Sequence, residues 1–135
     1  MGLTVLDAGV IIGVLDAKDA HHAAARTALS AAIERGDALA VPASAYGECL
    51  VGPARRGCDE MRAVDRFLLD LPAEVEPVTR QLAARAAQLR ARHRRLGLPD
   101  ALVLATALHL RADRVLTTDR GWPASELTIE VVRRR

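Results

Sequence analysis

Aromatic residues are nearly absent from this chain of 135 residues, which has one Trp, one Tyr and one Phe. Proteins that bind single-stranded nucleic acid on a sheet or an OB-fold stack its bases on aromatic side chains, so this shortage argues against both classes. Half of the residues are hydrophobic, and the core must therefore consist of Ala, Leu, Val and Ile. The length and the apolar content predict a single domain over residues 1–135, without help from disulfides or a structural metal.

Cysteine and long apolar runs are also scarce. Cys49 and Cys58 are the only cysteines, and they provide neither a disulfide framework nor a zinc-binding motif, so we expect reduced thiols. The longest apolar run, residues 8–15, lies between two Asp residues and is too short to span a membrane. No basic segment precedes it, which makes it a poor signal peptide. We therefore expect a cytoplasmic protein that does not contact a membrane.

Lysine occurs once, at Lys18, whereas arginine supplies the other 18 basic residues. The net charge is only +2, so the chain is not cationic overall. The planar guanidinium group suits bidentate contacts to phosphate, but arginine usage also follows genome composition and by itself identifies no partner. The basic run at residues 90–95 and the arginine tail at residues 133–135 therefore keep two interpretations, solvated surface or RNA contact.

Apolar segments of strand length and helix length alternate along the chain. This alternation predicts an α/β fold in which helices cover both faces of a mostly parallel sheet. The predicted strands span residues 4–6, 38–41, 115–118 and 127–132, and residues 75–78 are predicted as a short strand or an extended link. The predicted helices span residues 8–15, 20–35, 44–52, 59–71, 79–96 and 100–110, with Asp19 and Ser44 as N-caps, Pro53 ending the third helix and Gly97 ending the fifth.

Four acidic residues fall where this fold would bring them to one edge of the sheet. Asp7 and Asp119 each directly follow a predicted strand. Glu48 lies early in the helix after the second strand, and Asp100 begins the helix that leads into the fourth strand. Ligands of open parallel sheets bind beyond the carboxyl ends of the strands. We therefore predict one site formed by Asp7, Glu48, Asp100 and Asp119.

Three of these acids also have a simple structural interpretation: Asp7 as a helix N-cap, Asp100 as a first-turn acid and Asp119 as a turn residue. Their combination is harder to explain in this way. At a separation of about 5 Å and an effective dielectric of about 20, each like-charged pair costs roughly 3 kcal/mol. Six such pairs would cost about 10 kcal/mol or more, which is comparable to the stability of a whole domain. Either some acids are protonated or a cation neutralises them, and oxygen ligands favour Mg²⁺ or Mn²⁺.

At these residues the chain resembles the PIN-domain family, and within it the VapC toxins of bacterial toxin–antitoxin pairs. The resemblance covers essentially the whole chain. No single segment is specific, whereas four acids in this order and context are. The matching segments are VLD at residues 5–7, PASAYGE at 42–48, LPDA at 98–101 and LTTDRGW at 116–122.

The resemblance implies a three-layer α/β/α sandwich with the activity of a Mg²⁺- or Mn²⁺-dependent endoribonuclease. It implies a cognate antitoxin that blocks the active site, and a homodimer. Loops of transfer RNA or ribosomal RNA are sensible substrates, because selective ribonucleases generally cut where bases are unstacked. By the same resemblance, the residues that hold the metal and position the attacking water are Asp7, Glu48, Asp100 and Asp119.

The family often has Ser or Thr directly after the first Asp, where this chain has Ala8. Thr117 and Thr118 are the better hydroxyl candidates, although both also suit a strand as β-branched residues. A phosphoryl transferase of the haloacid dehalogenase type needs a second Asp where Gly9 stands, and a receiver-type domain needs a lysine after a late strand, whereas the only lysine is Lys18. The remaining alternative is a PIN-like protein that binds RNA or a partner without cleaving it, which Ala8 leaves open.

Overall fold

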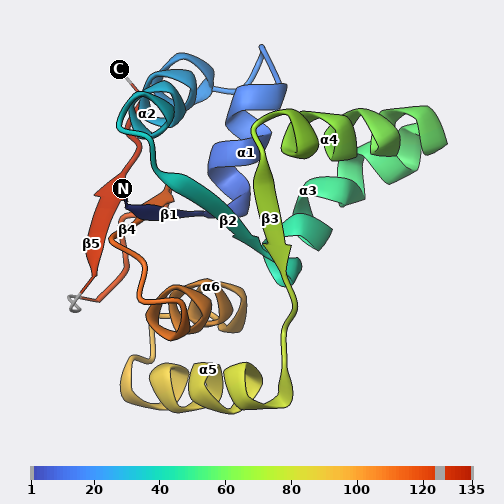
Figure 1. The fold of residues 1–135 in the computed structure, drawn as a ribbon. Coiled ribbons are helices and arrows are strands. Elements are labelled where there is room, and N and C mark those ends of the chain that lie inside the picture. Colours follow the sequence, from blue (N-terminus) through green and yellow to red (C-terminus); the bar gives the residue numbers. More distant parts are fainter. Residues whose placement is uncertain (1, 124–126, 135) are drawn as a thin grey trace.

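The computed structural model describes residues 2–123 and 127–134, which form a sheet between layers of helices (Figure 1). The strand order is β3-β2-β1-β4-β5, and each of these neighbouring pairs is parallel. The predicted α/β fold is therefore confirmed. In chain order the elements are β1 (Leu3–Leu6), α1 (Ala8–Leu15), α2 (His22–Glu34), β2 (Ala38–Pro42), α3 (Ala43–Arg56), α4 (Cys58–Asp70), β3 (Ala73–Glu76), α5 (Arg80–Arg92), α6 (Leu98–His109), β4 (Arg114–Thr117) and β5 (Thr128–Val131).

Strand β1 lies at the centre of the sheet. Its residues Thr4, Val5 and Leu6 are fully buried, because both faces of a central parallel strand are covered. From β1 the chain moves outward to β2 and β3 on one side, and then crosses to β4 and β5 on the other side. The strand order therefore reverses between β1 and β4, where Leu6 pairs with Leu116. Such a reversal opens a crevice beyond the carboxyl ends of the two strands.

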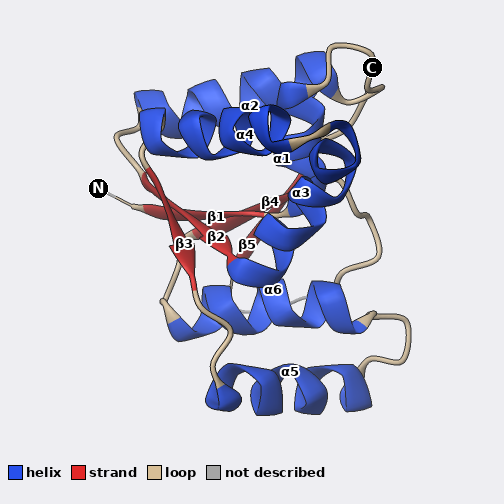
Figure 2. Cartoon of the chain, turned by 90° about the vertical axis from the view of Figure 1, so that its right-hand side faces the viewer, coloured by secondary structure: helices blue, strands red, loops and turns tan. Residues whose placement is uncertain are grey.

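Helices cover both faces of the sheet, as the sequence predicts. Figure 2 shows α1, α2 and α4 on one face, and α5 and α6 on the other. Helix α6 lies between the sheet and α5 and contacts both, which explains its almost wholly apolar sequence. No helix in the described residues is long and apolar enough to cross a membrane. Both cysteines, Cys49 and Cys58, are free.

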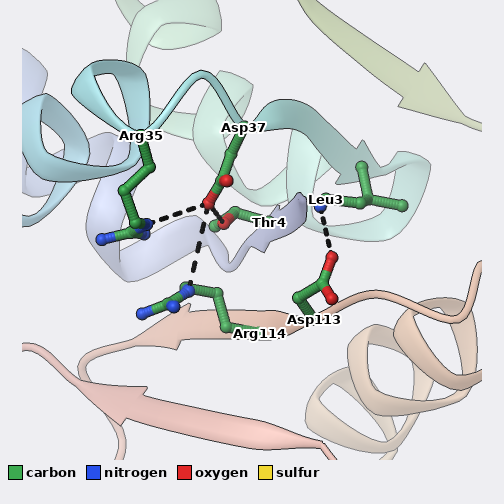
Figure 3. Close-up of polar contacts among 6 residues, drawn as sticks. All are labelled: Leu3, Thr4, Arg35, Asp37, Asp113 and Arg114. Atoms are coloured by element: carbon green, nitrogen blue, oxygen red, sulfur yellow. Dashed lines mark hydrogen bonds and ion pairs between the residues drawn. The ribbon is translucent and has the colours of Figure 1, made fainter. Parts of the chain in front are cut away.

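At the amino edge of the sheet, the Asp37 carboxylate joins β1, β2 and β4 (Figure 3). Its Oδ2 accepts hydrogen bonds from the Thr4 hydroxyl at 2.9 Å and from the Arg35 Nε at 3.2 Å. The Arg114 Nε lies 4.0 Å from the same oxygen. The hydrogen bond from Thr4 is the main reason why the pKa of Asp37 lies below its ordinary value, and Arg35 lowers it further. One charged group thus fastens three parallel strands at their starts.

Two predicted boundaries of α3 are wrong. Ser44 is not the N-cap, because α3 begins at Ala43, directly after the extended backbone of Pro42. Pro53 does not end the helix, because it lies in the last turn, where a missing N–H removes a single backbone hydrogen bond. The helix ends instead before Gly57, whose φ of 139° favours glycine.

Two other helix boundaries also differ from the prediction. Helix α5 ends at Arg92 rather than at residue 96, because Leu96 leaves the helix to pack among buried residues of α5 and α6. Gly97 is consequently the N-cap of α6 and not the end of α5. The Asp19 carboxylate accepts a hydrogen bond from the His21 N–H in a turn, and α2 begins at the following residue. Strand β3 also starts two residues before its predicted range.

The substitution Asp37→Asn tests the network at the amino edge. A carboxylate whose pKa is lowered by folding stabilises the protein above its unfolded pKa of about 3.9, and this contribution is lost as the pH falls through the lower folded pKa. Denaturant unfolding should therefore show a lower midpoint for the variant at neutral pH. The two proteins should converge as the pH falls through the lowered folded pKa of Asp37, because the wild type then loses the same contribution. Identical midpoints at neutral pH would contradict this account.

Candidate active site

Asp7 joins β1 to α1. It is the N-cap of α1, and its Oδ1 accepts a hydrogen bond from the Ala8 N–H at 2.8 Å. Its own N–H donates to the Leu116 carbonyl of β4 at 3.0 Å, which continues the contact of β1 with β4 beyond the strand. Asp7 is only 8% exposed, and this burial is the main reason why its pKa is raised. The predicted N-cap geometry is therefore present, and it leaves the second carboxylate oxygen to accept a hydrogen bond from another residue.

Thr117, the last residue of β4, connects Asp7 with Asp119. Its hydroxyl donates to the Asp7 Oδ2 at 2.8 Å and accepts from the Asp119 N–H at 3.1 Å. Thr117 is fully buried, and its hydrogen bond to Asp7 is shielded from water. Of the two hydroxyl candidates, Thr117 and Thr118, it is Thr117 that binds Asp7. It donates a hydrogen bond that Ala8, which has no hydroxyl, cannot make.

Asp119 and Asp100 form a coupled pair at the same edge. Asp119 lies in a turn after β4, where its Oδ1 accepts a hydrogen bond from the Gly121 N–H at 2.7 Å. Asp100 lies in the first turn of α6, and its carboxyl group is hydrogen-bonded to that of Asp119. Burial raises the pKa of Asp100 to about 7, and the Asp119 hydrogen bond and the charges of Asp7, Asp119 and Glu48 also raise it. The Gly121 N–H, followed by Asp100, lowers the pKa of Asp119.

Glu48 approaches this edge from α3. Burial raises its pKa, and the charge of Asp7 raises it further. The pKa values of Asp7, Glu48 and Asp100 are thus all raised, as expected for carboxyl groups that are partly desolvated and lack a counter-charge. The structure brings the four predicted acids into one electrostatic neighbourhood.

The four acids are coupled neighbours rather than a closed metal-binding shell. Over residues 2–123 and 127–134, no group of three acidic, histidine or cysteine side chains is arranged to hold a metal ion. The donor set nevertheless suits a hard divalent cation, because it consists only of carboxylate oxygens. The raised pKa values indicate that these carboxyl groups lack a counter-charge. A bound cation would supply it and favour the charged form of each acid.

Gly9 marks a close approach that the sequence analysis missed. A Cβ atom at Gly9 would lie 2.3 Å from the Thr118 Oγ1, so the start of α1 approaches the end of β4 more closely than a side chain at this position permits. The signal in the sequence was a glycine in the first turn of an otherwise apolar helix. Gly9 thereby lets α1 and the segment after β4 meet beside Asp7.

A groove of about 470 Å³ opens beside the acids, between α1, α3 and α4. Ile12 and Leu15 of α1 line it and are 37% and 42% exposed. Glu48 belongs to both the groove and the acid cluster, and Arg56 and Glu60 add charge to the lining. The groove is therefore an apolar and charged surface continuous with the candidate site.

The PIN domain family matches residues 4–125 of the chain. Among solved structures, a toxin–antitoxin complex from Klebsiella pneumoniae aligns with a TM-score of 0.77 and 21% identity, over 98% of this chain and 99% of that one. VapC20 of Mycobacterium tuberculosis, a sarcin–ricin loop cleaving toxin, aligns with a TM-score of 0.66 and 20% identity, over 83% and 86%. VapBC2 from Rickettsia felis, bound to a promoter DNA fragment, aligns with a TM-score of 0.72 and 13% identity, over 96% and 98%. These likenesses establish the fold, and no curated protein sequence matches the chain.

The substitution Thr117→Val tests the hydrogen bonds that join Asp7 to the turn after β4. It should lower the free energy of unfolding by about 1–3 kcal/mol, because a buried carboxylate loses its donor and the Asp119 N–H loses its acceptor. Thr117→Ser keeps the hydroxyl and serves as the control. Urea unfolding of both variants measures the difference. A loss of stability in Thr117→Val no greater than that in Thr117→Ser would contradict this account, because only the Ser variant keeps the hydroxyl.

Proposed function

This chain belongs to the PIN domain family, and on that basis we propose that it is a divalent-metal-dependent endoribonuclease that hydrolyses RNA. The observation that carries the proposal is that four acids lie near one another at the reversal of strand order between β1 and β4. Raised carboxyl pKa values in a crevice beyond parallel strands are typical of functional sites.

In this proposal the ligands of the Mg²⁺ or Mn²⁺ ion are the four acids Asp7, Glu48, Asp100 and Asp119. The cation, when bound, supplies charge neutralisation at the scissile phosphate and lowers the pKa of a nucleophilic water. Thr117 and the Ala8 N–H hold the two carboxylate oxygens of Asp7, and the Gly121 N–H holds one oxygen of Asp119. Hydrogen bonds of this kind orient ligands before the ion arrives, which reduces the reorganisation that binding requires.

We also propose that the ribonuclease is the toxin of a toxin–antitoxin pair. The similar proteins from Klebsiella pneumoniae and Rickettsia felis come from such complexes. The groove between α1, α3 and α4 supports an inhibitory protein partner, because it combines the exposed Ile12 and Leu15 with Glu48 of the acid cluster. A partner segment lying in this groove would block the approach of RNA to Glu48.

The substrate, the oligomeric state and the compartment remain predictions. The similar protein from Mycobacterium tuberculosis cleaves the sarcin–ricin loop, which supports ribosomal RNA as one of the two RNA classes to test, beside transfer RNA. We propose a homodimer, which the resemblance to the family implies, and a cytoplasmic location. Sequencing of RNA ends in cells that express the protein would identify the cleavage site.

The purified protein, free of antitoxin, should cleave a structured RNA pool with Mg²⁺ or Mn²⁺ and stop when EDTA is added. The variants Asp7→Asn and Asp100→Asn should each lower the rate by about 100-fold or more, because loss of even a hydrogen-bond partner of a metal ligand costs about 10–100-fold. The rates are measured by gel electrophoresis of the RNA.

The control for this experiment is Asp70→Asn, at an exposed acid that ends α4. It removes the same charge and should leave cleavage unchanged. Full cleavage by both Asp7→Asn and Asp100→Asn would overturn the assignment. RNA binding without cleavage by the wild type would favour the non-enzymatic PIN-like alternative.

The groove predicts how the partner inhibits the enzyme. Ala63 is exposed and lines the groove from α4, whereas Glu48 lies on α3, so Ala63→Trp should occupy the α4 side of the groove without disturbing the core. The variant should keep its RNA cleavage but resist inhibition by the small protein encoded beside it at least about tenfold better, because a hot-spot contact of about 1.4 kcal/mol or more is lost. A titration of the cleavage assay with that protein measures the change. Unchanged inhibition would exclude this groove as the docking site.

A further inference from the structure

Four exposed arginines surround the connection between α5 and α6: Arg90, Arg92, Arg94 and Arg95. Within the described residues, none of their side chains forms a hydrogen bond or an ion pair with the protein. No acidic side chain therefore neutralises these arginines, and their guanidinium groups can bind an external anion.

A helix C-terminus explains only part of this cluster. Arg90 and Arg92 lie in the last turn of α5, where cations interact favourably with the helix dipole. Arg94 and Arg95 come after the end of the helix, and this effect fades within the last turn. The two arginines beyond the helix therefore need another explanation.

The connection is anchored and not a free tail. Leu96 is 2% exposed and packs among the buried residues of α5 and α6. The Leu96 N–H donates to the His93 carbonyl at 2.9 Å, and the His93 N–H donates to the Leu89 carbonyl at 3.0 Å. Arg94 and Arg95 are consequently presented from a short, fixed turn, which reduces the ordering cost of binding an anion there.

The turn also lies beside the acid cluster. Gly97 caps α6, and Asp100 stands in the first turn of that helix, five residues after Arg95. Figure 2 shows the α5–α6 connection at the end of the molecule toward which β1 runs from the N-terminus. The other end of α5, which carries Arg80, is about 18 Å away, because the helix has 13 residues.

We propose that Arg94 and Arg95, assisted by Arg90 and Arg92, bind backbone phosphates of the RNA strand next to the bond that is cleaved. This inference rests on the proposed ribonuclease function. Four carboxyl groups repel a polyanion, and with a net chain charge of only +2 the overall field offers little compensation. Fixed guanidinium groups beside the acids provide the local attraction, and their fork geometry matches phosphate oxygens.

The test compares two doubly substituted proteins that each lose two positive charges. The loop variant is Arg94→Gln/Arg95→Gln, and the control is Arg80→Gln/Arg85→Gln in the N-terminal half of α5. Binding to a fluorescein-labelled single-stranded RNA 20-mer is followed by fluorescence anisotropy in EDTA at several salt concentrations. The loop variant should bind about tenfold or more weakly than the control at low salt, and its salt slope should fall by about 1.4, which corresponds to two phosphate contacts.

Cleavage with Mn²⁺ separates this inference from the proposed function. In the loop variant KM should rise about tenfold while kcat at saturating RNA stays close to that of the control, because the arginines bind the neighbouring phosphates and not the reacting one. Equal RNA affinities and salt slopes for the two variants would overturn the inference, even if the wild type cleaves RNA. A wild type that fails to cleave, but whose RNA binding depends on Arg94 and Arg95, would support the binding surface and overturn the nuclease.

Discussion

The hydrogen bond from the Thr117 hydroxyl to the Asp7 carboxylate holds the candidate site to the sheet. It spans the junction of β1 and β4 at 2.8 Å, and it exists because Leu6 pairs with Leu116 just before both strands end. A shift of this register by one residue would turn Thr117 to the other face of the sheet. The cap of α1, the burial of Asp7 and the turn that carries Asp119 all depend on that alignment. The site is thus a consequence of where two central strands stop.

The two edges of the sheet show how neighbouring groups set the pKa of a carboxyl group. At the amino edge, Asp37 accepts hydrogen bonds from a hydroxyl and a guanidinium group, and its pKa is lowered. At the carboxyl edge, the partly buried Asp100 meets three other acids, and its pKa rises to about 7. The first acid stabilises the fold, whereas the second holds a proton that a cation would displace. A protein keeps such an unfavourable cluster where function requires it.

The sequence predicted the parts of this protein that follow from periodicity and chain order. The alternation of strands and helices predicted an α/β fold with a parallel sheet. The acids that directly follow strands predicted a site at one edge of that sheet. Contacts between residues that are distant in the sequence could not be predicted. The close approach at Gly9 and the hydrogen bond to Asp7 from Thr117 rather than Thr118 both depend on how α1 meets β4. Local signals also failed where packing outweighed them, as when Pro53 stayed inside α3 and the burial of Leu96 made Gly97 a cap.

The central claim is that these acids form one site for a divalent cation. Anomalous diffraction from crystals grown with Mn²⁺ tests it most directly, because the signal locates the ion without reference to activity. The account predicts a peak at about 2.1–2.2 Å from carboxylate oxygens of Asp7 and at least one of Asp100 and Asp119. It also predicts that the peak disappears in crystals of the Asp100→Asn variant. A manganese peak elsewhere, or none at this edge at saturating Mn²⁺, would contradict it.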